Sequence, residues 1–186
     1  MNSFAAFVLA SVATFLLVAT TEGVRGPNLL KRDVPDAFQI YANFPVGVGV
    51  TDIDNDNIMD CLSAKRKDFD PEAKTVTYIW SLNGDDGSSR KHVAFHHYAG
   101  ATPDATNFTV GNDSNMAVAH FLYTDYKDCA ILEIPHFGDE CILFVSREKE
   151  NDVPESCLEQ FTDTCGEAIS LRDRHVCVDD DTEDED

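Results

Sequence analysis

Seven short segments of the chain have the length and the apolar, β-branched and aromatic content that are typical of β-strands. The last two are apolar runs joined by a Pro/Gly turn, which predicts a β-hairpin. The segments are separated by stretches rich in Asp, Pro, Gly and Ser, and residues 83–87 form a strong Asn-Gly turn signal. The expected strands span residues 58–65, 75–82, 92–99, 107–110, 117–124, 129–134 and 141–146. With no long helix between them, they predict an antiparallel barrel or sandwich.

Two short helices are expected beside these strands. The first begins near residues 35–41, within an otherwise weakly patterned region that reaches residue 57. The second follows the last hairpin, where Pro154 suits a first helical turn and Leu158 and Phe161 share one apolar face. The pattern therefore predicts a mainly β fold with one helix packed against the hairpin.

The N-terminal segment predicts secretion. Residues 4–20 carry no charge, and residues 21–23 include small residues of the kind that a signal peptidase reads, so we expect a signal peptide over residues 1–23. The alternative is a membrane anchor, but an apolar run of this length is short for a span. We expect a secreted, extracellular domain over residues 24–178 and no membrane association.

Charge excludes some partners. The chain has a formal net charge of −20, which repels nucleic acid and anionic membranes and attracts cationic partners. Part of this charge lies in residues 179–186, where seven of eight residues are acidic. We expect this segment to be a disordered, solubilising tail.

All six cysteines follow the predicted signal peptide. An even number in a secreted chain predicts three disulfide bonds, although spacing alone leaves fifteen pairings open. Their wide separation indicates a full-sized fold and matches no zinc-finger spacing. They are Cys61, Cys129, Cys141, Cys157, Cys165 and Cys177.

No catalytic constellation stands out in the sequence. It contains no G-x-S-x-G, no Gly-rich phosphate loop and no H-E-x-x-H, so we expect neither enzymatic activity nor a cofactor. His92 and His96 share one strand face beside His97, which is a conceivable metal pair. Without a third ligand at suggestive spacing, we expect exposed strand histidines.

Residues 52–57 resemble a calcium-binding loop at first sight. Asn57 replaces the required glycine, however, and Ser63 stands where the bidentate Glu belongs. We expect a polar turn here and no metal site. Two glycosylation sequons occur at Asn107 and Asn112, and either of them can remain unoccupied.

Aromatic residues recur on the expected strands. About half of them must belong to ordinary core packing, because each strand has two faces. A small closed barrel can also hold one ligand inside, and burial of apolar area then supports binding at roughly 25 cal/mol per Å². The residues are Tyr78, Trp80, Phe95, Phe121, Tyr123 and Phe144.

Four segments together resemble the salivary lipocalins of ticks, a family that includes the histamine-binding proteins. They are residues 101–104, 126–132, 141–145 and 153–158, and they occur in the family's order between Cys61 and Cys177. The resemblance implies an antiparallel eight-stranded lipocalin barrel with a short N-terminal helix and a packed C-terminal helix. It also implies three disulfide pairs: Cys61–Cys177, Cys129–Cys157 and Cys141–Cys165.

Amine-binding members of that family carry acids inside the barrel. The matching positions here are Ala99, His120 and Ile142, none of them acidic. An ammonium buried without a counter-charge is strongly disfavoured, so an apolar ligand fits better. Strand alternation from these positions does not fix the face of Trp80, which we include among the expected cavity residues. The full set is Trp80, Phe95, His97, Ala99, His120, Leu122, Ile142 and Phe144.

The resemblance implies a monomeric, non-enzymatic salivary lipocalin that binds a small hydrophobic ligand and modulates host immunity. The chain also resembles the Japanin-like group in its short N-terminal region, and that group is associated with sterol binding and with altered dendritic cells. Two alternatives stay open. One is a scavenger of histamine or serotonin, and the other is a filled barrel that engages a host immune-cell protein, receptor or complement component.

Overall fold

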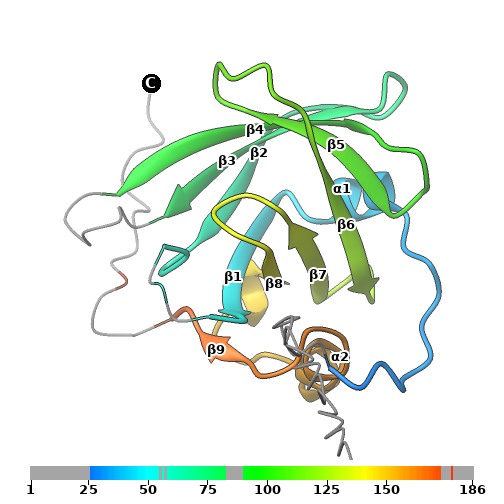
Figure 1. The fold of residues 1–186 in the computed structure, drawn as a ribbon, viewed down its shortest axis with the longest axis vertical. Coiled ribbons are helices and arrows are strands. Elements are labelled where there is room, and N and C mark those ends of the chain that lie inside the picture. The colour runs from blue at the N-terminus through cyan, green and yellow to red at the C-terminus, as the bar shows by residue number, and fades with distance from the viewer. Residues whose placement is uncertain (1–25, 55, 57, 83–89, 173–176, 178–186) are drawn as a thin grey trace, which may run out of the picture.

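The strands form a closed antiparallel barrel (Figure 1). The computed structural model describes residues 26–54, 56, 58–82, 90–172 and 177. Eight strands follow one another around the barrel, and β1 closes it by pairing with both β2 and β8. The strands are β1 (Val46–Asp52), β2 (Ser63–Asp70), β3 (Thr75–Leu82), β4 (Lys91–Ala99), β5 (Ala105–Val110), β6 (Ala117–Thr124), β7 (Cys129–Ile134) and β8 (Glu140–Ser146), with β9 (Ile169–Ser170) beside β1.

The predicted eight-stranded barrel with two helices is confirmed. β3 shows the alternation most clearly, since Val76, Tyr78, Trp80 and Leu82 are buried and the residues between them are partly exposed. The predicted signal peptide, acidic tail and turn at 83–87 lie outside the described residues. Among the described residues, no helix is long and apolar enough to cross a membrane.

Strand β1 was not predicted, and its glycines explain why. Gly47 and Gly49 occupy the inward-facing positions, where a strand pattern normally shows large apolar residues. A Cβ at Gly49 would lie 2.9 Å from the Leu62 side chain, and one at Gly47 would lie 3.3 Å from Phe144. The glycines therefore make room for large side chains that reach in from neighbouring segments.

Strand β2 begins five residues later than the sequence predicts. The apolar residues Met59 and Leu62 belong to the turn before the strand, where Cys61 has φ of 58°. Both are fully buried because they close over the end of the barrel core. An apolar turn of this kind has the same composition as a strand, which is why the prediction for residues 58–65 was wrong at its start.

Helix α1 (Ala37–Asn43) closes one end of the barrel. The side chain of Asp36 caps it by accepting hydrogen bonds from the backbone N–H groups of Phe38 and Gln39. The Tyr78 hydroxyl donates to the Phe44 carbonyl, and the Arg66 guanidinium donates to the Tyr41 carbonyl. These contacts hold the C-terminal end of the helix against β2 and β3.

Helix α2 (Glu155–Cys165), which follows the short 3₁₀ helix η1 (Arg147–Lys149), packs on the outside of β7 and β8. Phe161 is fully buried there, in a second apolar cluster separate from the barrel interior. Disulfides join Cys129 to Cys157 and Cys141 to Cys165, so each hairpin strand is bonded to the helix. The third disulfide joins Cys61 to Cys177, and the three pairs are those that the resemblance implies.

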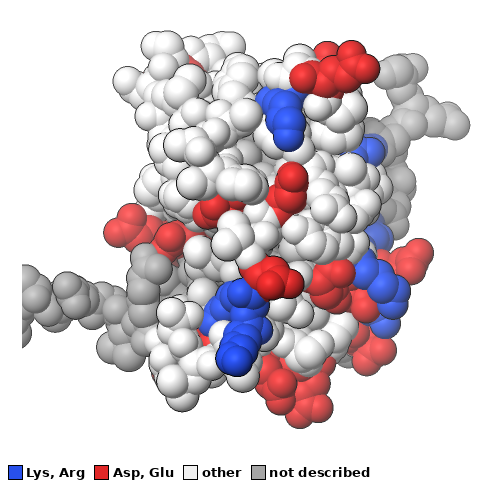
Figure 2. All heavy atoms as spheres, turned by 90° about the vertical axis from the view of Figure 1, so that its right-hand side faces the viewer, with Lys and Arg blue, Asp and Glu red and all other residues white. Residues whose placement is uncertain are grey.

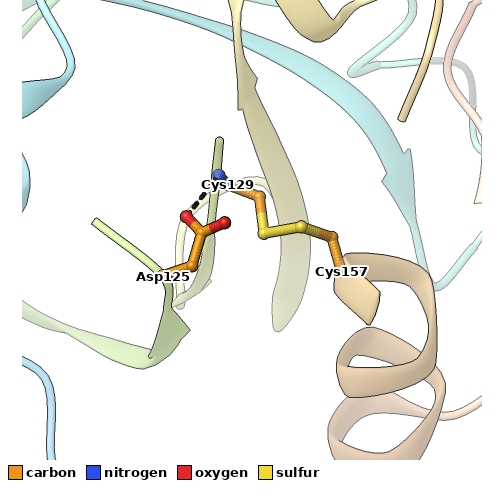
Figure 3. A group of neighbouring side chains, drawn as sticks. All are labelled: Asp125, Cys129 and Cys157. Atoms are coloured by element: carbon orange, nitrogen blue, oxygen red, sulfur yellow. Dashed lines mark hydrogen bonds between the residues drawn. A yellow bond between two sulfur atoms is a disulfide. The ribbon is translucent and has the colours of Figure 1, made fainter. Parts of the chain in front are cut away.

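Asp125 fixes the turn that leads into the first of these bridged strands. One oxygen of its carboxylate accepts hydrogen bonds from the backbone N–H groups of Lys127, Asp128 and Cys129. Figure 3 shows this carboxylate beside the Cys129–Cys157 disulfide. The three side chains lie close enough to hold a metal, but both sulfurs are already bonded to each other. The group is therefore a structural connection between β7 and α2.

Candidate ligand-binding site

Aromatic rings from five strands and α1 fill most of the barrel interior. Trp80 and Phe95 stack with their ring centres 4.3 Å apart. Tyr41 reaches in from α1, and its ring centre lies 5.4 Å from that of His97 and 5.4 Å from that of Phe121. Offset and edge-on contacts of this kind add to the stability that apolar burial provides. The interior is thus a packed aromatic core with little free space.

A small cavity remains between α1 and the strands. Its volume is about 50 Å³, which is room for a few water molecules or a small apolar group. Its lining is almost entirely apolar and contains no Asp, Glu, Lys or Arg. The lining residues are Ile40, Tyr41, Phe44, Gly47, Ala64, Tyr78, Trp80, His97, Phe121, Ala130, Leu132 and Phe144.

The polar groups at the cavity are satisfied by one another and are uncharged. Thr106 lies 3.2 Å from His97 Nδ1 and 3.3 Å from the Tyr41 hydroxyl, within hydrogen-bond distance of both. Burial, with a smaller effect of neighbouring His96, lowers the pKa of His97 to about 3. Burial also raises the pKa of Tyr41 and of Tyr78. The side chains around the cavity are therefore neutral at physiological pH.

Five of the eight predicted cavity residues lie inside the barrel. Trp80, His97 and Phe144 line the cavity directly. Phe95 and Ile142 are fully buried in the same interior core, but they do not line the cavity. The alternation that the sequence predicts for β4 and β8 therefore places these side chains on the inner face.

The other three predicted residues lie elsewhere, so their placement in the cavity was wrong. Ala99 is exposed at the last position of β4. His120 lies on the outer side of β6, with its side chain 42% exposed and Nδ1 3.1 Å from the carboxylate of Asp104. Leu122 packs against the outer apolar cluster next to α2.

The prediction placed His120 by its match to the family and Leu122 by alternation from His120, and a β-bulge in β6 turns both side chains away from the interior. The β6–β7 register shifts between Phe121 and Tyr123, which places one extra residue in β6. Counting back by twos from the hairpin through this bulge reverses the two faces. Ala119 and Phe121 therefore point inward instead.

The sequence also missed the part of the wall that α1 contributes. Ile40, Tyr41 and Phe44 line the cavity, whereas the sequence predicted only that a short helix begins near residues 35–41. Gly47 and Ala64 carry no signal in the sequence, because small residues serve there to leave space for larger ones. Their role becomes visible only when the facing side chains are known.

The two sequons differ in accessibility. Asn107 lies in β5, and its side-chain amide donates to the Ala99 carbonyl at 3.0 Å. Asn112 lies in the exposed turn that follows β5. The geometry favours Asn112 as the more accessible acceptor, and glycosylation of either residue stays a prediction.

Comparison with known families finds a match to this sequence. The family described as tick histamine binding protein matches residues 50–174, which is more than half of the chain. No curated protein matches the chain by sequence.

Solved structures with the same fold are similar at low sequence identity. Japanin from Rhipicephalus appendiculatus, bound to cholesterol, is 14% identical with a TM-score of 0.52, over 70% of this chain and 94% of that one. A protein named AM182, in complex with serotonin, is 14% identical with a TM-score of 0.54, over 72% and 86%. Insecticyanin from the tobacco hornworm Manduca sexta is 14% identical with a TM-score of 0.58, over 80% and 88%.

Proposed function

Because the chain belongs to the tick histamine-binding protein family, whose fold is that of a ligand-binding lipocalin, we propose that its barrel binds a small, uncharged, largely apolar ligand. The observation that carries this proposal is the cavity beside α1, which has an apolar lining and no charged residue. A sterol or a lipid mediator has the required chemistry, and Japanin is a structural neighbour that is bound to cholesterol. The protein would be secreted in tick saliva and would modulate the host immune response, with dendritic cells as one target.

The same lining disfavours a biogenic amine in this cavity. An ammonium group that leaves water without a carboxylate partner loses several kcal/mol. Ile142 provides no carboxylate, and Ala99 and His120 lie away from the cavity. AM182 was solved with serotonin, but the acids that an amine requires are absent from this lining.

The size of the cavity limits the ligand. A volume of about 50 Å³ is far below the range of roughly 300–1,000 Å³ that drug-sized ligands occupy. A sterol therefore enters only if α1 moves outward or the rings of Tyr41 and Phe44 turn away. Helix α1 has only seven residues, and the strands β2 and β3 hold its C-terminal end by hydrogen bonds from two side chains, Arg66 and Tyr78. We therefore expect α1 to move when a larger ligand enters.

Native mass spectrometry of the secreted protein tests this proposal. We expect a bound lipid of low mass, and a variant with a filled cavity should lose it. Ala130→Leu adds volume at the cavity wall, whereas Ala94→Leu adds the same volume at a partly exposed position of β4. At least a tenfold loss of binding with Ala130→Leu, and little change with Ala94→Leu, is the expected result.

The small cavity also favours a second candidate, a filled barrel that engages a host immune-cell protein. On the face shown in Figure 2, acidic side chains are dispersed among uncharged ones and among Lys and Arg. This face therefore offers no single acidic patch for a cationic partner. If the secreted protein is empty and takes up neither sterols nor fatty-acid derivatives, the second candidate replaces the first.

A further inference from the structure

Three carboxylates meet at the end of the barrel opposite α1. Asp52 is the last residue of β1, Asp54 follows it, and Glu140 is the first residue of the antiparallel neighbour β8. One oxygen from each side chain lies within 4.8 Å of the others. Since β1 begins next to α1, its full length separates this group from the cavity side of α1.

Glu140 is buried without a partner among the residues that the structure describes. It is 1% exposed, and neither of its carboxylate oxygens has a hydrogen-bond donor or contact with solvent. Asp52 is also 1% exposed, and its carboxylate accepts one weak hydrogen bond, at 3.3 Å from the Asp54 backbone nitrogen. In the part of the chain that the structure describes, no Lys or Arg forms an ion pair with these three carboxylates. A buried carboxylate in this state is strongly disfavoured unless a cation pairs with it.

The electrostatics of the group favour a cation beside these carboxylates. Burial, reinforced by the charges of Asp54 and Asp52, raises the pKa of Glu140 to about 8. Burial likewise raises the pKa of Asp52 to about 7 against the effect of its hydrogen bond from Asp54. A bound cation would remove the repulsion that contributes to both shifts.

We propose that Asp52, Asp54 and Glu140 form a calcium-binding site. Oxygen atoms at the Ca²⁺ coordination distance of about 2.3–2.6 Å lie at most about 5 Å apart, which the spacing of 4.8 Å satisfies. Carboxylates from a loop and a strand end suit the flexible coordination of Ca²⁺ better than the strict octahedron of Mg²⁺. From the sequence alone we expected no metal site here, because Ser63 stands where a calcium-binding loop carries its bidentate Glu. In the folded chain, Glu140 at the start of β8 provides a carboxylate in its place.

Calorimetric titration of the intact folded protein with CaCl₂ tests the site. We expect one ion per chain with a Kd of about 10⁻⁴–10⁻³ M, the range of extracellular calcium-binding modules. The unfolding temperature should rise by several degrees at millimolar calcium. An equal ionic strength of NaCl should produce no such rise.

Glu140→Gln keeps the shape of the side chain and removes its charge. We expect this variant to be at least as stable as the unmodified protein without calcium and to lose calcium binding by at least tenfold. Asp56→Asn is the matched control, because Asp56 is an exposed acid of the same loop whose carboxylate accepts a bond from the Ile58 backbone. This control should retain binding within about threefold.

Other results would overturn the calcium site. One is a thermal response that NaCl reproduces, since screening alone then explains it. Another is equal calcium binding by Glu140→Gln and the unmodified protein. A third is histamine binding that Glu140→Gln abolishes in a protein that does not respond to calcium, because the group would then hold an amine. None of these results bears on the apolar cavity at the other end.

Discussion

His97 shows at the scale of one residue how burial sets the chemistry of the interior. Its ring is 2% exposed, lies next to Tyr41 and shares Thr106 with it as a hydrogen-bond partner. A charged imidazole there would have no counter-charge, and this is why its pKa falls to about 3. The neutral, polarisable ring of His97 therefore forms part of the cavity lining.

The first prediction is that His97 makes folding sensitive to acid. The folded-state pKa is about 3 and the ordinary value is 6.5, so the contribution to stability is complete above pH 6.5 and is lost as the pH falls towards 3. Between pH 7 and pH 5 the loss is about 2 kcal/mol, at 1.36 kcal/mol per pH unit below 6.5. The raised pKa values of Asp52 and Glu140 act in the opposite direction over the same pH range, so the loss from His97 is measured as a difference between two proteins. In urea unfolding, the free energy of unfolding of the unmodified protein relative to that of His97→Asn should fall by about 2 kcal/mol between pH 7 and pH 5.

His96→Asn is the control for this prediction, because His96 is on the outer face of the same strand and lies 3.1 Å from the Thr77 hydroxyl. If His97→Asn and the unmodified protein lose the same stability between the two pH values, the acid sensitivity has another origin.

The second prediction concerns the glycines of β1. Gly49→Ala places a Cβ 2.9 Å from the Leu62 side chain, so it should lower the free energy of unfolding by about 1–3 kcal/mol. Gly47→Ala should cost less, because its nearest neighbour is a ring atom of Phe144 at 3.3 Å. Chemical denaturation measures both variants. Equal and small losses would contradict the close packing described for β1.

At the scale of elements, regular alternation was predictable and exceptions to it were not. The bounds of β3, β6 and β7 match the sequence prediction, because polar and apolar residues alternate in β3 and clear turns bound the apolar run of β7. β1 was missed because glycine, a residue poor in strand signal, fills its inward positions. In β6 the strand was predicted correctly but its inner face was not, since a bulge leaves no mark in the pattern. The cavity wall was therefore only partly predictable.

The third prediction is that the Cys129–Cys157 bond holds α2 on the barrel. It closes a segment with a sequence separation of 28. In the chain-entropy model such a loop contributes about 3–4 kcal/mol. Cys129→Ala/Cys157→Ala should lose about that amount in denaturant unfolding and should expose the amides of α2 to hydrogen exchange before those of β3. If the amides of β3 lose protection as early as those of α2, the bond stabilises the whole barrel and does not act locally on α2.

At the scale of the whole molecule, the fold contains two apolar clusters, one between α2 and the hairpin and one inside the barrel. The outer cluster, with two of the three disulfides, fixes α2 and the hairpin and leaves the barrel interior independent of them. The inner cluster surrounds the cavity and is closed by α1, which has no disulfide. A ligand that displaces α1 would therefore enlarge the interior without disturbing the bridged side of the barrel.

The fourth prediction follows from this division. A covalent bridge that fixes α1 to the barrel strands should reduce the binding of large ligands more than that of small ones. The Tyr78 hydroxyl donates a hydrogen bond to the Phe44 carbonyl at the end of α1. Tyr78→Phe removes this hydrogen bond with little change in the shape of the side chain. We expect the uptake of a fluorescent sterol to become at least twofold faster in Tyr78→Phe, measured by stopped-flow. Unchanged or slower uptake would show that α1 does not limit entry.

The central claim is that the barrel prefers an uncharged, apolar ligand to a biogenic amine. Calorimetric titration of the delipidated, unmodified protein with cholesterol or a fatty acid, and separately with histamine and serotonin, tests it most directly. We expect saturable binding of an apolar ligand in the micromolar range or tighter, and no amine binding below about 100 μM, because the cavity lining carries no acid to neutralise an ammonium. Submicromolar binding of histamine or serotonin within the barrel would contradict the account.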